Sequence, residues 1–314
     1  MQNLLSTLVI FIVLATRALE ATQIILPLYS YPTNSEWPGV EAALANYPGV
    51  EFILIINPSN GPGTLTSEWE VAISTLKGYS NALVVGYVDT VQTSRSIGDV
   101  EGDVSSYASW PADCRPSGIF FDDVTQDDVS YYSTVASFAT SQIPGATVLL
   151  NPGAPATSGY FEFADQVIIY EDSYGNYESF DTELDVVSSS QLSAIIYSVP
   201  TSGNALGTLV STFVEVGYGS VYLTNSDNSY QSLGSDWDTF CALIGSNNQG
   251  PAPTTDSSSD SSSDSTSSST DPSNAPTTTP SGVSSDSTST SQPVVDPTPT
   301  RHAHVCRRNY PPIL

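Results

Sequence analysis

Five acidic residues have the same sequence context, because each lies at the end of a short apolar run. They are Asp89, Asp122, Asp123, Glu171 and Asp172. Neighbouring residues of a strand point to opposite sides, so only one member of each adjacent pair can face a given space. Two carboxyl groups that face one space can divide the work of an acid and a base between them. The acids therefore predict carboxylate chemistry at the ends of strands.

The chain between residues 22 and 248 contains no histidine, since His302 and His304 both lie near the C-terminus. This excludes a Ser-His-Asp triad, a Cys-His dyad and a histidine-based zinc site from that region. Lys77 is its only lysine and lies in a segment with helical spacing, which argues against Schiff-base catalysis. Carboxylates remain as the groups that can exchange protons near neutral pH.

Glycoside hydrolysis is a common reaction that needs only two carboxylates, one that protonates the leaving oxygen and one that attacks or activates water. Aromatic and polar residues at the predicted strand ends could contact a sugar, although tyrosine is also a common packing residue of strands. The residues expected to bind substrate are Tyr29, Asn57, Tyr87, Asp89, Asn151, Tyr170 and Tyr197.

A divalent cation held by Asp89, Asp122 and Asp123 is a competing use of the acids. Calcium sites usually draw on a dense local run of oxygen ligands, and the sequence has no such run here. We therefore expect neither a metal nor a cofactor.

Eight short apolar runs recur at even spacing and would position these residues. They cover residues 24–29, 52–56, 82–88, 119–121, 147–150, 166–170, 194–197 and 220–223. Helical spacing of apolar residues follows the second, fourth and seventh runs, at residues 65–76, 129–139 and 205–213. This alternation predicts a (β/α)8 barrel of the TIM type. A doubly wound open sheet is the alternative architecture. No glycine-rich phosphate loop follows the first run, and this argues against a nucleotide-binding version of that fold.

The two ends of the chain differ in composition from this central region. Residues 1–21 contain an apolar run followed by small residues and indicate a cleaved signal peptide, with a membrane anchor or a buried strand as the alternative. Residues 22–248 form the predicted barrel. Residues 249–314 are a tail rich in Ser, Thr, Pro and Asp, which we expect to be disordered. We expect a secreted protein that acts outside the cell or in its wall, and the role of the basic residues 301–314 stays unassigned.

The chain has a net charge of −26, and 26 of its acidic residues lie between residues 22 and 248 against three basic ones. Such a surface repels nucleic acid and anionic membranes, and it admits neutral or cationic ligands. The same acidity would also serve solubility alone. We expect a monomer without membrane insertion after signal cleavage. Pairing of Cys114 with Cys241 is left open, because nothing in the sequence places them together.

An ordered series of motifs carries a family resemblance over residues 24–242. The motifs are ILPLYSYP, LIINPSNGPG, VVGYVDT, SGIFFDDV, LLNPG and VIIYEDSY. They resemble the spherulation-specific family 4, or spherulin-4-like, proteins. The resemblance implies a (β/α)8 barrel. It also implies kinship with secreted fungal glycoside hydrolases that cut polysaccharide containing galactosamine or N-acetylgalactosamine, such as galactosaminogalactan.

In the hydrolases of this family the fourth strand ends in Asp-Glu and the sixth in Tyr-Glu, which correspond here to Asp122-Asp123 and Tyr170-Glu171. The resemblance and the strand-end acids together suggest Asp122 as nucleophile or transition-state stabiliser, Glu171 as general acid/base and Asp123 as a supporting acid. Asp123 is one methylene shorter than the usual Glu, and a misplacement of about 1 Å can cost about 100-fold in rate. The alternatives are a catalytically inactive cell-wall or spore-coat protein that binds polysaccharide, and a barrel enzyme for another glycan.

Overall fold

The computed structural model describes residues 21–177 and 188–249. Eight parallel strands form a closed barrel in which each strand pairs with the next along the chain and β8 pairs with β1. The strands are β1 (Gln23–Leu28), β2 (Phe52–Ile56), β3 (Ala82–Asp89), β4 (Gly118–Asp122), β5 (Thr147–Leu150), β6 (Gln166–Ser173), β7 (Leu192–Tyr197) and β8 (Ser220–Leu223). Each predicted run forms one of these strands, so the predicted (β/α)8 barrel is confirmed and the doubly wound alternative is wrong.

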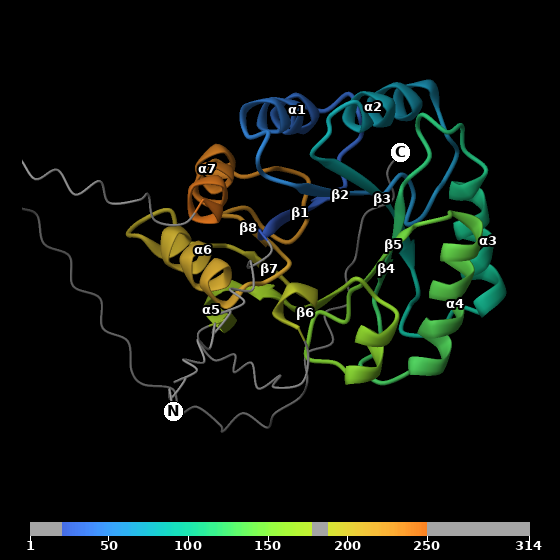
Figure 1. Cartoon of the computed structure of the whole chain (residues 1–314). Helices are drawn as coiled ribbons and strands as arrows, with labels where there is room; N and C mark the ends of the chain where they lie inside the picture. The colour runs from blue at the N-terminus through green and yellow to red at the C-terminus, as the bar shows by residue number, and fades with distance from the viewer. Residues whose placement is uncertain (1–20, 178–187, 250–314) are drawn as a thin grey trace, which may run out of the picture. The chain divides into compact units, whose positions relative to one another are not determined.

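Helices connect most of the strands and lie around the outside of the barrel (Figure 1). They are α1 (Glu36–Asn46), α2 (Ser67–Lys77), α3 (Ile97–Ala108), α4 (Val129–Gln142), α5 (Tyr174–Tyr177), α6 (Ala205–Val216) and α7 (Trp237–Asn248). The connection after β5 departs from the pattern, because it contains only the short 3-10 helix Ser158–Glu162. None of the helices in the described ranges is long and apolar enough to span a bilayer.

The strands form because their residues are apolar on both faces. All five residues of β2 and of β4 are buried, as expected for parallel strands with side chains filling the barrel inside and helices covering it outside. Gly86 in β3 shows how tightly a helix packs there. A Cβ at this position would lie 2.7 to 2.9 Å from three ring atoms of Tyr107 in α3, so the close approach requires glycine.

Two further expectations concern the cysteines and the ends of the chain. Cys114 and Cys241 are both buried and both free, so the structure does not contain the bridge that the sequence left open. The predicted signal peptide and tail lie outside the described residues except at their innermost positions, and the predicted division of the chain stays a prediction.

Candidate active site

The predicted acids meet at the carboxyl-terminal rim of the barrel. Asp122 is the last residue of β4, and it is the direct register partner of Asp89 at the end of β3. Its side chain is only 2 % exposed. The period of two along a strand places Tyr87 on the same face of β3 as Asp89, and Phe120 on the same face of β4 as Asp122. The register pairs Tyr87 with Phe120, and the contact between their rings shows that these residues lie on the same side of the sheet.

Two hydrogen-bond donors hold the Asp122 carboxylate. The Tyr87 hydroxyl donates to Oδ2 over 2.8 Å, and the Asn151 amide nitrogen donates to Oδ1 over 2.7 Å. Asn151 follows β5 and is itself 2 % exposed. Each oxygen of the carboxylate thus accepts a hydrogen bond, and the two bonds fix the orientation of the side chain.

Glu171 has the same kind of environment. Its Oε2 accepts a hydrogen bond of 2.6 Å from the same Asn151 nitrogen, and its Oε1 accepts one of 2.7 Å from the Tyr230 hydroxyl. The register between β6 and β7 shifts by one residue between Ile168 and Tyr170, just before Glu171. A one-residue shift exchanges the two faces of a strand, so this bulge decides which of the residues at the end of β6 faces Asn151.

The shared amide sets an upper limit on the separation of the two carboxylates. Because the Asn151 nitrogen lies 2.7 Å from Asp122 Oδ1 and 2.6 Å from Glu171 Oε2, these oxygens are at most about 5.3 Å apart. This limit lies below the separation of about 6.5–9.5 Å that leaves room for a water molecule between the two acids of a glycoside hydrolase.

Asp123 has a different position from Asp122. Its backbone is in the left-handed region, with a φ of 51°, where Asp is tolerated better than most residues. Gln92 in the β3–α3 loop donates to its carboxylate over 3.2 Å and to its carbonyl through the backbone N–H over 2.8 Å. The buried Thr90 hydroxyl bonds the carbonyls of both Asp122 and Asp123 and so fixes the turn at the end of β4.

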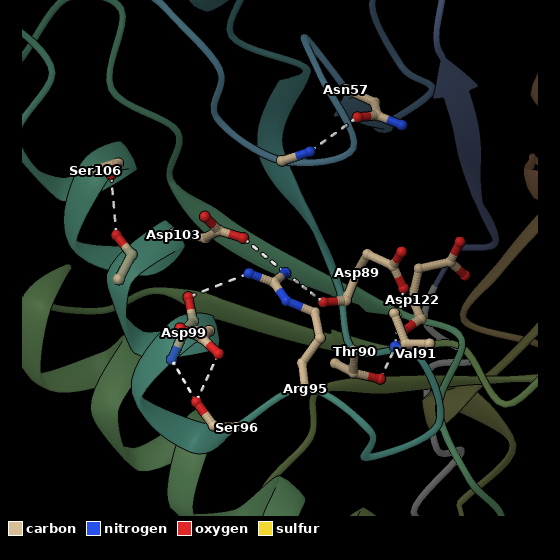
Figure 2. A network of polar contacts seen from close by, with 12 residues as sticks. Asn57, Asp89, Thr90, Val91, Arg95, Ser96, Asp99, Asp103, Ser106 and Asp122 are labelled. Carbon is tan, nitrogen blue, oxygen red and sulfur yellow. Dashed lines mark hydrogen bonds and ion pairs between the residues drawn. The ribbon is translucent and has the colours of Figure 1, made fainter. Parts of the chain in front are cut away.

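Asp89 belongs to a network that reaches outward from the rim. Figure 2 shows Arg95 between the carbonyl of Asp89 and the carboxylate of Asp103. Its guanidinium donates to these two groups over 2.7 and 2.8 Å. The Asp89 carboxylate itself accepts a hydrogen bond from the N–H of Val91. Burial raises the pKa of Asp89, and the negative charges of Asp122 and Asp123 raise it further.

Tyrosine rings form a wall that connects the two carboxylates. Tyr29, which follows β1, lies edge-on to Tyr87 at 5.5 Å and edge-on to Tyr230 at 5.9 Å between ring centroids. Tyr87 and Tyr230 donate to Asp122 and Glu171. The wall and Asn151 thus complete a closed ring of contacts around the carboxylate pair.

Other predicted substrate-binding residues have contacts elsewhere. The Tyr197 hydroxyl donates to Asp172, and the Tyr170 ring packs on Tyr177 while its hydroxyl donates to the carbonyl of Ser173. Asn57 accepts a hydrogen bond from the N–H of Gly61 within its own loop. The structure therefore brings Asp122, Glu171, Tyr29, Tyr87 and Asn151 together, with Asp89 and Asp123 beside them, and substrate contacts of the other three stay predictions.

Sequence reasoning missed Tyr230 and Thr90. Tyr230 lies in the long polar loop between β8 and α7, where no periodic pattern marks it. Its one signal is an aromatic residue within a run of Ser, Asn and Asp. Thr90 directly follows Asp89, and its complete burial was not visible in the sequence.

No group of three or more His, Cys, Asp and Glu residues within residues 21–177 and 188–249 is arranged to hold a metal ion. The arrangement of Asp122, Glu171 and their donors suits proton transfer and charge stabilisation.

Comparison with known proteins places these residues in context. A family model described as spherulation-specific family 4 matches residues 23–244. Spherulin-4 of Physarum polycephalum is 31% identical over an alignment of 222 residues, and the match covers 66% of this chain and 64% of that protein. The match thus spans less than two thirds of the length of Spherulin-4.

Among solved structures, Sph3 of Aspergillus clavatus in complex with GalNAc is similar to this chain. The two share 31% sequence identity with a TM-score of 0.67, and the match covers 72% of this chain and 98% of that one.

Proposed function

The chain belongs to spherulation-specific family 4, and from this membership we propose that it is a glycoside hydrolase that cleaves a polysaccharide containing galactosamine or N-acetylgalactosamine. The observation that carries the proposal is the bridge of Asn151, which holds Asp122 and Glu171 within about 5.3 Å of each other. GalNAc bound to the similar protein Sph3 supports an amino sugar as the ligand.

In this mechanism Asp122 acts as the ionised group and Glu171 as the proton donor. Tyr87 and Asn151 stabilise the charge of Asp122, so that it can attack the anomeric carbon or stabilise positive charge there. Glu171 gives its proton to the leaving oxygen and afterwards takes one from water. Tyr29 packs edge-on against both Tyr87 and Tyr230 and so holds in place the tyrosines that donate to the two carboxylates.

The separation of the acids favours retention of the anomeric configuration. Retaining enzymes hold their carboxyl groups about 5 to 5.5 Å apart, whereas inverting enzymes leave about 6.5 to 9.5 Å for a water molecule. We expect the first product released from the polymer to keep the configuration of the bond that was cut. An NMR spectrum of the newly formed reducing end, recorded before mutarotation, measures this directly, and an inverted first product would contradict the assignment of Asp122 as nucleophile.

Isosteric removal of each charge tests the function. Asp122→Asn and Glu171→Gln are each expected to lower the release of reducing ends from galactosaminogalactan by about 1,000-fold or more. Asp113→Asn and Glu215→Gln make the same chemical changes at exposed positions and serve as controls. Activity of the two site variants equal to that of the parent would refute the assignment.

A second function follows from Asp123, which stands where the family usually has Glu. If the shorter side chain does not support turnover, the same site would bind polysaccharide as a wall or spore-coat protein. Binding of the polymer without release of reducing ends distinguishes this function from hydrolysis.

We further propose that the protein acts outside the cell, on the basis of the signal-like pattern in residues 1–21. Sequencing of the N-terminus of the protein recovered from the growth medium tests this. A mature chain that begins soon after Ala18 or Ala21 is the expected result.

A further inference from the structure

Tyr230 reaches Glu171 from a strained backbone. Its φ is 50°, which is uncommon for a bulky residue, and its side chain is 3 % exposed. The ring packs edge-on to Tyr29 and contacts Tyr222 at the end of β8. Such strain persists only where the surroundings enforce it, and it is concentrated at functional sites. The contact that this conformation secures is the hydrogen bond of 2.7 Å to Glu171.

The two carboxylates accept hydrogen bonds from the same kinds of donor. Each accepts one bond from Asn151 and one from a tyrosine, Tyr87 for Asp122 and Tyr230 for Glu171. Asn151 donates to both carboxylates, whereas Tyr87 donates to Asp122 and Tyr230 donates to Glu171. A donor to the charged form makes a carboxylate harder to protonate.

We propose that Tyr230 is a positioning residue that controls at which pH Glu171 gives up its proton, while Tyr87 does the same for Asp122. This inference rests on the proposed function. Each tyrosine then governs one limb of the dependence of activity on pH.

Several other titratable groups surround the pair and remain in place in the test. Asp122 lies on β4 with Asp123 beyond it, and Asp89 lies on β3. On β6 itself Asp172 follows Glu171, and it accepts a hydrogen bond from Tyr197 of β7. The tyrosine variants described below keep all of these acidic side chains.

Tyr230→Phe removes the hydroxyl and keeps the ring. The basic limb of the pH profile of kcat/KM, which reports the general acid, is expected to move to higher pH by about one unit, while the acidic limb stays. Tyr87→Phe is expected to move the acidic limb upward instead, because Asp122 must be ionised. Tyr222→Phe removes a buried hydroxyl from the same aromatic group without touching a carboxylate, and it should move neither limb.

A uniform loss of activity in Tyr230→Phe with both limbs unchanged would overturn the inference and leave Tyr230 a packing residue. The titration can also be followed without activity, through the isotope-labelled carboxyl resonance of Glu171, assigned with Glu171→Gln. If the parent proves inactive on every polymer, the proposed function fails. A resonance that titrates at higher pH in Tyr230→Phe than in the parent still supports the inference, and identical titration still overturns it.

Discussion

At the scale of single residues, Asn151 determines the geometry of the site. Its amide nitrogen donates to both Asp122 and Glu171, and this orientation leaves its side-chain oxygen buried without a hydrogen-bond partner among the described residues. An unsatisfied buried carbonyl costs about 1–3 kcal/mol. The structure tolerates that cost because the opposite orientation would place an oxygen against two carboxylates.

Asn151→Asp is therefore expected to disable the site while keeping the shape of the side chain. It replaces the shared donor with a third carboxylate, so that Asp122 and Glu171 lose a donor and gain a repulsive neighbour. We expect kcat/KM to fall by about 100-fold or more. Asn247→Asp in α7, away from the rim, is the matched control. A loss of less than threefold at residue 151 would show that the amide does not orient the pair.

Asp89 leads to a prediction about stability. Its pKa is raised in the folded protein by burial and by Asp122 and Asp123, so its charge destabilises the fold at a pH above that raised value. The penalty disappears as the pH falls below the pKa of the unfolded chain, where Asp89 is protonated in both states. Asp89→Asn should increase the free energy of unfolding at neutral pH, since Asn can still accept the hydrogen bond from Val91.

Denaturant unfolding of parent and Asp89→Asn between pH 3 and pH 7 measures this difference. The gain should be largest at neutral pH and should shrink toward the acidic end. A variant that is equally or less stable at neutral pH would mean that Asp89 makes a compensating favourable contact as an anion.

At the scale of secondary structure, the strands could be predicted from the sequence and several helices could not. Parallel strands are apolar on both faces, and this leaves continuous runs such as FILII in β2. Helix α1 contains Pro38 and Gly39, and α3 contains Gly98 and Gly102, which lower helix propensity and obscure the pattern. Burial of Val100, Val104 and Tyr107 against the barrel stabilises α3 despite these residues.

Some residues of the site could likewise be predicted from the sequence, and others could not. Asp122 and Glu171 could be predicted because they end strands, whose position at the rim follows from the fold. Tyr230 could not, because its place depends on the path of the β8–α7 loop and on packing against Tyr29 and Tyr222. The direction of Tyr170 depends on the bulge in β6, which has no signature in the sequence.

The packing of α3 on β3 predicts that replacing two glycines with alanine has opposite effects on stability. Gly86→Ala would place a Cβ 2.7 Å from the fully buried ring of Tyr107, so we expect a loss of about 1–3 kcal/mol in the free energy of unfolding. Gly102→Ala adds a methyl group in α3 with no atom within 4 Å, and it should stabilise the protein by about 0.5–1 kcal/mol. Thermal unfolding of both variants measures the difference, and equal behaviour would show that Tyr107 can move aside.

At the scale of the whole molecule, acidic residues far outnumber basic ones in the barrel region. Residues 22–248 hold 26 acidic residues and only Lys77, Arg95 and Arg115 as bases. Each of the three bases is engaged: Lys77 bonds carbonyls near Arg115, Arg115 bonds the Trp110 carbonyl, and Arg95 pairs with Asp103. The rim of the barrel thus presents Asp89, Asp122, Asp123, Glu171 and Asp172 in an anionic environment.

This distribution predicts that salt acts differently on two forms of one polymer. Removing acetyl groups from N-acetylgalactosamine residues creates amines that are protonated near neutral pH, and an acidic surface accelerates the encounter with such a chain. We expect kcat/KM on the de-N-acetylated polymer to fall several-fold as ionic strength rises from about 0.01 M to about 0.15 M, because the screening length shortens from about 30 Å to about 8 Å. On the fully N-acetylated polymer of the same length the change should be less than twofold. In the proposed function the same residues cut both polymers. An equal response to salt would therefore show that the acidity serves solubility and leaves substrate capture unaffected.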